Sequence, residues 1–161
     1  MSLRSFQSAQ WLFPVVVTAH NLEEAIWLPA FVAEHAAQVP FVVSASEFRF
    51  GVTALTIAAW TVTYLSWRNG RESVWTYGLF GYIVAMLLNV AAPHLIAAAV
   101  FRGYAPGVVT AVALNLPVLS YLTFLALRER FVSGRKAALF GVAVPLGLVA
   151  AIASLFALAR S

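Results

Sequence analysis

The sequence predicts an all-α membrane protein built as one bundle of five transmembrane helices. Of its 161 residues, 62% are hydrophobic and only 10% are charged, whereas ordinary soluble domains are about 45–50% apolar. The apolar residues fall into five runs that reach the ~20 residues needed to cross a ~30 Å hydrocarbon core. Each run is expected to be helical, because lipid offers no hydrogen bonds to an open backbone.

The five predicted spans follow one another with short connections. They cover about residues 10–32, 47–67, 75–100, 107–127 and 137–158. The connections are too short to hold a second domain, so residues 1–161 are predicted to form a single transmembrane domain. We expect the longest connection, residues 33–46, to lie along the outer surface, with Pro40, Phe41, Val42 and Val43 dipping into the interface.

The positions of the basic residues predict the orientation of the bundle. Seven of the ten precede the first span, separate the second from the third, or separate the fourth from the fifth. These are Arg4, Arg68, Arg71, Arg128, Arg130, Arg135 and Lys136. With five helices the three places share one side, which the positive-inside rule makes cytoplasmic. The N-terminus is therefore expected inside and the C-terminus outside, and the net charge of +4 is no sign of a nucleic-acid partner.

Polar residues inside the predicted spans gather at similar depths. His20, Glu23 and Glu24 interrupt the first span, and Glu47 and Arg49 begin the second. The others are Asn89, His94 and Arg102 in or just after the third span, and Asn115 in the fourth. In the predicted orientation nearly all of them lie in the outer half, on the first four helices. We therefore expect one polar pocket among those four helices.

The polar residues of the first span share one helical face. His20, Glu23, Glu24 and Trp27 are separated by three or four positions, the spacing of neighbours on a helix surface. A charged side chain at mid-membrane costs at least ~2.5–3.5 kcal/mol, so lipid is an unfavourable neighbour for this face. The face is expected to point into the bundle.

Prolines predict kinks next to the polar residues. Pro93 removes the hydrogen bond to the carbonyl of Asn89, and Pro29 does the same for Ala25. Pro117 does the same for Ala113, beside Asn115 in the fourth span. Carbonyls freed in this manner are tolerated where they line a cavity or find partners inside the protein. Small residues should let the third span approach its neighbours closely, among them Gly78, Gly81 and Ala85.

Two kinds of site chemistry fit these residues. In general acid/base chemistry, His20, Glu23, Glu24 and His94 would transfer protons, with Asn89 and Asn115 orienting them. In a metal site, the candidate ligands for zinc, iron or manganese are His20, Glu23, Glu24, Glu47 and His94. Arg49, Arg102 and Trp27 are the candidate substrate-binding residues near the entrance. With no cysteine in the chain, disulfide and thiol chemistry are excluded.

Four segments together resemble a known family. They are HNLEE at 20–24, EFR at 47–49, NVAAPH at 89–94, and RGYAPGVVTA…LNLP from 102 to 117. Their order and spacing are similar to the HXXEE family of small bacterial membrane proteins. The resemblance implies a multi-span helical protein of the bacterial inner membrane, with the polar residues named above as its functional residues. It implies no activity.

The sequence as a whole favours a membrane-embedded enzyme that acts on a small hydrophobic or lipid-like substrate. That substrate can carry an anionic group. A likeness in architecture to the sterol-isomerase type of membrane enzyme, in which buried carboxylates and a histidine move protons, supports this by analogy. The alternative is a proton- or cation-coupled transporter, or a ligand-binding protein, that uses the same cluster. The absence of an internal repeat disfavours a transporter unless the chain forms a homo-oligomer, which the sequence leaves open.

Overall fold

The computed structural model of the chain is all-α, as predicted, and describes residues 4–38 and 44–158. A short α1 (Phe6–Ala9) leads into the long helices α2 (Leu12–Glu34) and α3 (Ala45–Asn69). The next long helix consists of α4 (Val74–Asn89), the π-helical η1 (Val90–Leu95) and α5 (Ile96–Val100). The following long helix consists of α6 (Val108–Thr110), η2 (Ala111–Asn115) and α7 (Leu116–Arg128). The last long helix is α8 (Gly134–Leu158). The predicted contact of residues 40–43 with the interface lies outside the described residues.

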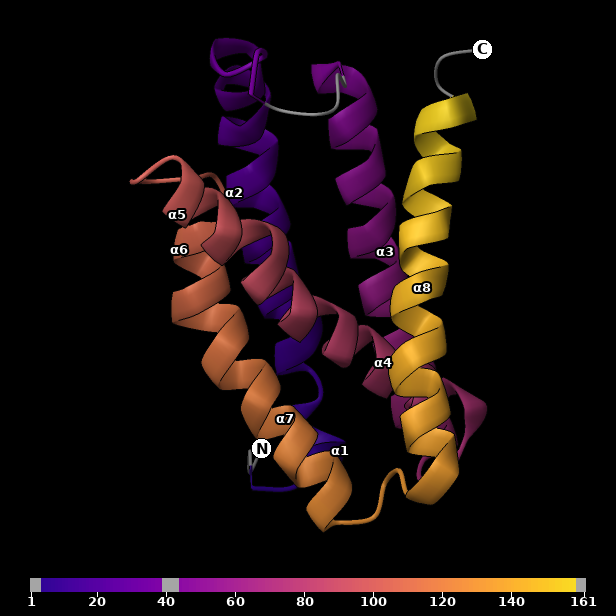
Figure 1. Cartoon of the computed structure of the whole chain (residues 1–161). Helices are drawn as coiled ribbons and strands as arrows, with labels where there is room; N and C mark the ends of the chain where they lie inside the picture. Colours follow the sequence, from indigo (N-terminus) through magenta and orange to yellow (C-terminus); the bar gives the residue numbers. More distant parts are fainter. Residues whose placement is uncertain (1–3, 39–43, 159–161) are drawn as a thin grey trace.

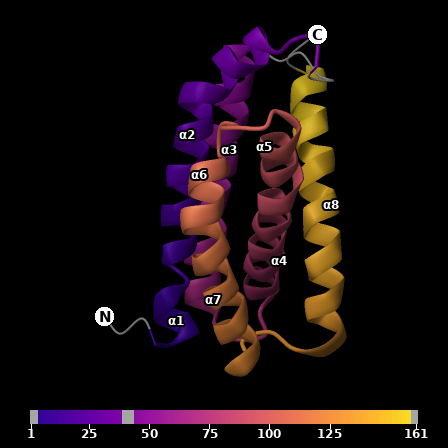
Figure 2. The same ribbon diagram turned by 60° about the vertical axis from the view of Figure 1, so that its left-hand side comes forward.

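Four of the described helices are long and apolar enough to cross a membrane. They are Ala45–Asn69, Val74–Val100, Val108–Arg128 and Gly134–Ser154. The helix α2 has 23 residues but carries the polar residues of HNLEE near its middle. The long helices α2, α3 and α8 run lengthwise along the bundle, and the helix of α4 and α5 crosses them at a tilt in Figure 1. The short α1 lies at one end of the bundle and the last turns of α8 at the other (Figures 1 and 2).

The apolar core lies at one end of the bundle, which we call the core end. It joins α1 to the first turns of α2 and α4 and the last turns of α7. Phe6, Phe13 and Leu122 are fully buried there, and the ring centroids of Phe6 and Phe131 are 4.9 Å apart. We call the opposite end, which holds η1, η2 and the start of α3, the cavity end.

Polar contacts fasten the loops at the core end. The backbone N–H of Phe6 donates to Glu129 Oε2 over 3.1 Å. The hydroxyls of Tyr77 and Ser133 both donate to the carboxylate of Glu72. These two hydrogen bonds, that of Tyr77 first, hold the pKa of the Glu72 carboxyl below its usual range.

Close packing of α4 against α8 depends on Gly81. A Cβ atom at this position would lie 2.5 Å from the carbonyl oxygen of Phe140 and 2.6 Å from Val144 Cβ. Any larger residue would therefore force the two helices apart. The predicted role of small residues in the third span is confirmed at Gly81, and Figure 2 shows α8 alongside α4.

The helix that contains Pro93 is broken, as predicted. Ala92 leaves the helical region, with φ −133° and ψ 116°, and the Ala92–Pro93 peptide bond is cis. A second π-helical segment, η2, ends just before Pro117 and packs against η1. In α2 the carbonyl of Ala25, which Pro29 leaves free, accepts a hydrogen bond from Arg49 Nε over 3.1 Å. The freed carbonyl thus finds a partner inside the protein, which is what the proline pattern predicts.

A candidate metal centre at the helix break

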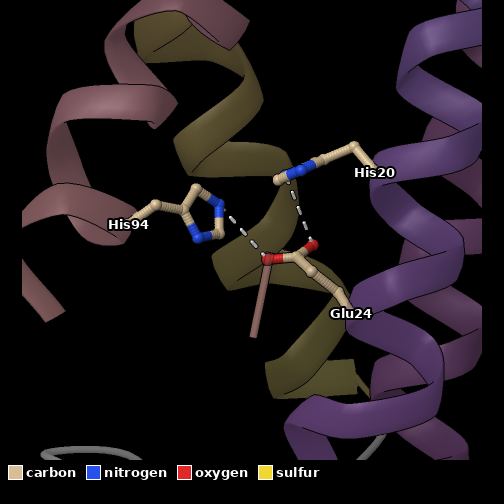
Figure 3. A group of neighbouring side chains, drawn as sticks. All are labelled: His20, Glu24 and His94. Atoms are coloured by element: carbon tan, nitrogen blue, oxygen red, sulfur yellow. Dashed lines mark ion pairs between the residues drawn. The ribbon is translucent and has the colours of Figure 1, made fainter. Parts of the chain in front are cut away.

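Three of the predicted site residues meet at the cavity end. Glu24 lies between two histidines, with its Oε1 3.5 Å from His94 Nε2 and its Oε2 3.9 Å from His20 Nε2 (Figure 3). One ligand atom from each of the three residues can be chosen so that all lie within 4.8 Å of one another. His20 and His94 are 1% and 2% exposed, so the cluster is buried.

Local structure explains why these three side chains converge. His20 and Glu24 are four residues apart on α2 and therefore lie one above the other on the same helical face. His94 belongs to η1, where the change of direction at Ala92 turns the chain. The rings of the two histidines meet edge to face, with centroids 4.7 Å apart.

The hydrogen bond of His94 determines which of its ring nitrogens carries a proton. Nδ1 lies 3.2 Å from the carbonyl oxygen of Pro106, which can only accept, so Nδ1 must be the donor. Nε2 then faces two oxygens, Asn89 Oδ1 at 2.9 Å and Glu24 Oε1 at 3.5 Å. Oxygens on two sides suit either a proton or a metal ion at this nitrogen.

His20 presents its Nε2 to the same carboxylate. Its Nδ1 lies 2.9 Å from Thr110 Oγ1. Its Nε2 is buried and has no hydrogen-bond partner among the described residues. A buried nitrogen with no partner is unfavourable unless a further group completes the site. Both histidines therefore direct Nε2 at Glu24 while Nδ1 is held by an oxygen, an arrangement common among metal-binding histidines.

The donor set fits a divalent metal ion. Two imidazoles and one carboxylate are the three protein ligands of one kind of catalytic zinc site, and they also suit iron(II). Tetrahedral ligands at about 2.0–2.1 Å from a zinc ion lie about 3.3 Å apart. The distances of 3.5 and 3.9 Å join the histidines to different oxygens of Glu24, and the three ligand atoms lie within 4.8 Å of one another, so the cluster is wider than a closed zinc site. The three side chains would move closer together to bind an ion.

A cavity of about 750 Å³ adjoins the cluster. Its polar lining includes His20, Asn21, Glu24 and Asn89, and the rest is mainly apolar. The predicted pocket among the first four spans is wrong in one respect. The walls come from α2, α3, α4 with η1, and α8, and none of the lining residues belongs to the fourth predicted span. The reason is the close packing of α8 on α4, which brings apolar residues such as Leu146 and Val149 to the cavity.

Glu23 has a different environment from its neighbour Glu24. Its Oε1 accepts hydrogen bonds from Tyr104 Oη at 2.9 Å and from the Gly107 N–H at 3.1 Å. Its Oε2 accepts from the Thr110 N–H at 2.9 Å and from Thr110 Oγ1 at 2.6 Å. Glu23 therefore joins α2 to the start of α6, and it lies outside the group of three candidate ligands.

Two further predictions need correction. The Glu47 carboxylate was expected to be a fourth ligand, but it accepts from the Ser44 N–H over 2.7 Å and completes a capping box at the start of α3. Helix capping places it at the helix terminus, and it is not in the group of three.

Trp27 was expected to face inward with Glu23, but its side chain is 57% exposed. An apolar ring is stable against lipid, so nothing requires it to turn inward.

The remaining predicted residues surround the cluster at various distances. Asn89 touches it through His94, as described above. Asn115 is fully buried, and neither its Oδ1 nor its Nδ2 has a hydrogen-bond partner in the described part of the chain. Arg49 is exposed and bound to α2 through Ala25, and Arg102 is exposed in the turn after α5 with φ 52°.

Three residues that were not predicted from the sequence complete the site. Pro106 and Thr110 provide the oxygens that hold the two histidines. Gly107 has φ 88°, and a Cβ there would collide with the His94 ring and lie 3.1 Å from Glu24 Cγ. All three belong to the segment RGYAPGVVTA. A glycine directly after a proline in this segment was the available signal, because it suggests a turn with positive φ.

By length and composition, the four long apolar helices beside the buried histidine–glutamate cluster indicate the class of helical membrane proteins. Within that class the chain belongs to the family described as "Protein of unknown function with HXXEE motif", whose model matches residues 11–122. It is 30% identical over 144 residues to the uncharacterized protein YrkK of Bacillus subtilis (strain 168), which covers 89% of this chain and 90% of that one. No solved structure matches. The family resemblance of the sequence is confirmed.

Proposed function

We propose that the chain is a membrane-embedded, metal-dependent enzyme that acts on a small hydrophobic or lipid-like substrate. The observation that carries this proposal is the position of the His20, Glu24 and His94 cluster at the polar side of a mainly apolar cavity. An apolar cavity with a few convergent polar groups is the usual form of a ligand site. The side chains that hold the ion would thus lie next to the substrate.

The proposal includes the arrangement in the membrane. We place all five long helices across the bacterial inner membrane, α2 included, with the core end at the cytoplasmic side. The basic residues Arg68, Arg71 and Arg128 lie at the core end, in line with the positive-inside rule. The polar face of α2 is largely covered by α6 and η1, which supports α2 as a span despite its glutamates.

In this proposal each residue of the cluster has a defined role. Glu24 would bind the ion through its carboxylate, and His20 and His94 through Nε2. An ion held by three side chains can keep a position open towards the cavity, where it would activate water or polarise a carbonyl or phosphoryl oxygen. The apolar walls from α3 and α8 would bind the substrate chain and exclude bulk water.

A second candidate is acid/base chemistry without a metal. The surroundings of His94 Nε2, with one oxygen at 2.9 Å and another at 3.5 Å, suit an added proton as well as an ion. In that case His94 and Glu24 would exchange a proton with the substrate.

Metal analysis of detergent-purified protein separates the two candidates. We expect about one zinc, iron or manganese ion per chain in the wild type, and its loss in Glu24→Gln and in His94→Ala. His35→Ala is the matched control and should keep the metal, because His35 stacks on Phe31 with ring centroids 4.2 Å apart, away from the cluster. A metal-free wild type would exclude the metal-dependent version and leave the acid/base one.

Reconstitution in proteoliposomes tests the enzyme against a transporter. An enzyme should convert an added lipid-like substrate in detergent as well as in vesicles. Flux of protons or cations that is lost in Glu24→Gln, with no change in any lipid, would contradict an enzyme and support a transporter.

A further inference from the structure

We propose that Glu23 and Thr110 are positioning residues that set the tautomer of His20 and so keep its Nε2 free to bind. This inference rests on the proposed function, since the free Nε2 matters if His20 is a ligand. It concerns the protons of three side chains in a row: the carboxylate of Glu23, the hydroxyl of Thr110 and the imidazole of His20.

The first step is the state of Glu23. Four donors point at its two oxygens, two from backbone N–H groups and two from the hydroxyls of Tyr104 and Thr110. A carboxylate that receives donors on both oxygens acts as an acceptor only, which is the role of the ionised form.

The second step is the direction of the Thr110 hydroxyl. A hydroxyl has one proton to donate, and Thr110 Oγ1 lies 2.6 Å from Glu23 Oε2 and 3.3 Å from the carbonyl oxygen of Gly107. Both neighbours are acceptors. The short contact with the carboxylate assigns the proton to the bond with Glu23, because charge-assisted hydrogen bonds are the shorter and stronger ones.

The third step follows for His20. Because the Thr110 proton is used by Glu23, Thr110 Oγ1 can only accept from His20 Nδ1, which lies 2.9 Å away. Nδ1 must then carry the proton of the neutral ring, and Nε2 keeps its lone pair. This Nε2 is buried without a hydrogen-bond partner and lies 3.9 Å from Glu24 Oε2. A metal ion needs that lone pair, because a protonated nitrogen cannot bind it.

The two glutamates of HNLEE would accordingly have different tasks. Glu24 would hold the ion directly. Glu23 would act through Thr110, which comes from a helix 87 residues further along the chain. Histidine ligands commonly have such a second partner, and its loss typically lowers metal affinity about 10–100-fold.

The test is a nitrogen-15 NMR spectrum of histidine-labelled protein, freed of metal with a chelator and held at a pH where the rings are neutral. The chain has only three histidines, so the spectrum is simple, and comparison with His20→Gln assigns the His20 signals. We expect Nδ1 of His20 to be protonated and Nε2 to be unprotonated in the wild type. A protonated Nε2 in the wild type would overturn the proposal.

Two variants of Thr110 form the matched pair. Thr110→Val keeps the shape but has no hydroxyl, so the proton should move to Nε2 in part or completely, and zinc affinity in a competition titration should fall about 10–100-fold. Thr110→Ser keeps the hydroxyl and should retain the wild-type tautomer and affinity. If Thr110→Val keeps both the wild-type tautomer and the wild-type zinc affinity, the proposal is wrong.

The outcomes distinguish this inference from the proposed function. A wild type with the expected tautomer but no metal would leave the tautomer assignment intact and reject metal dependence. A wild type that binds metal, with no effect of Thr110→Val on tautomer or affinity, would support metal dependence and reject the positioning role of Thr110. Should the valine variant fail to fold, the wild-type and serine spectra still decide the direction of the hydrogen bond.

Discussion

The core end and the cavity end of the bundle are made from the same helices but packed in opposite ways. At the core end, Phe13 and Leu122 are fully buried in an apolar cluster. At the cavity end, the same α2 continues into His20 and Glu24, and the helix that begins with α4 breaks at Ala92. The cavity of about 750 Å³ adjoins this cluster. Dense packing thus positions the helices at one end. A buried polar cluster, which costs free energy, is possible at the other end.

The path of α4 shows how this change occurs along one helix. Leu79 and Ile83 are fully buried, and Gly81 between them lets α8 come close. Two turns later Asn89 lines the cavity, and the proline that follows ends regular α-helix. π-helical segments within α-helices occur frequently at functional sites, and here both of them flank the candidate metal centre.

The largest expected effect tests whether the core end provides the stability. Leu122→Ala removes a fully buried side chain and should lower the free energy of unfolding by about 2–5 kcal/mol. Leu146→Ala is the matched change at the cavity, where the leucine is 65% exposed and lipid replaces it with little cost. Denaturant unfolding in detergent measures both. Equal losses in the two variants would contradict the contrast between the two ends.

A smaller effect is expected at Gly107, which belongs to the cavity end. Gly107→Ala forces a side chain into positive φ, at a cost of about 1–3 kcal/mol, and pushes against His94, so metal binding should be lost as well. Gly134→Ala is the control, because Gly134 also has positive φ (56°) but open space around it. That variant should lose stability and keep the metal. Metal retained in Gly107→Ala would show that the turn does not shape the site.

The smallest effect concerns the pH dependence of stability, to which Glu72 contributes at the core end. The pKa of Glu72 is lowered in the folded protein by the Tyr77 hydroxyl, so the ionised form stabilises the fold. This contribution is present above the pKa of the unfolded chain and disappears as the pH falls through the lower pKa of the folded one. Between pH 7 and pH 3 the melting temperature of the wild type should therefore fall more than that of Glu72→Gln. Equal falls would mean that Tyr77 and Ser133 do not stabilise the ionised carboxylate.

Much of the candidate site was accessible from the sequence. His20, Glu24 and His94 were predicted to meet, because charges in long apolar helices must face inward and the proline pattern placed a kink beside His94. The link from Arg49 to the carbonyl of Ala25 also follows the expectation that freed carbonyls find partners. These inferences succeed because they depend on local rules, namely helical spacing, the loss of one N–H at proline, and the cost of charge in lipid.

The different tasks of Glu23 and Glu24 could not be read in this way. The two are neighbours in sequence with the same chemistry, and only their surroundings separate them. Glu23 meets the turn around Gly107 and Thr110, whereas Glu24 meets His94. Those partners come from segments 70 or more residues further along, and no local pattern specifies which of two adjacent carboxylates each segment will touch.

The sequence by itself determined the all-α class, the long helices, the break beside Pro93 and the candidate ligand residues. These properties depend on composition and on spacing within one helix. Only the tertiary structure decided that α8 lines the cavity, that Glu47 caps a helix, that Trp27 faces outward, and that Thr110 holds His20. Each of these depends on how closely separate helices approach, and that distance is set by packing at contacts such as Gly81 against Val144.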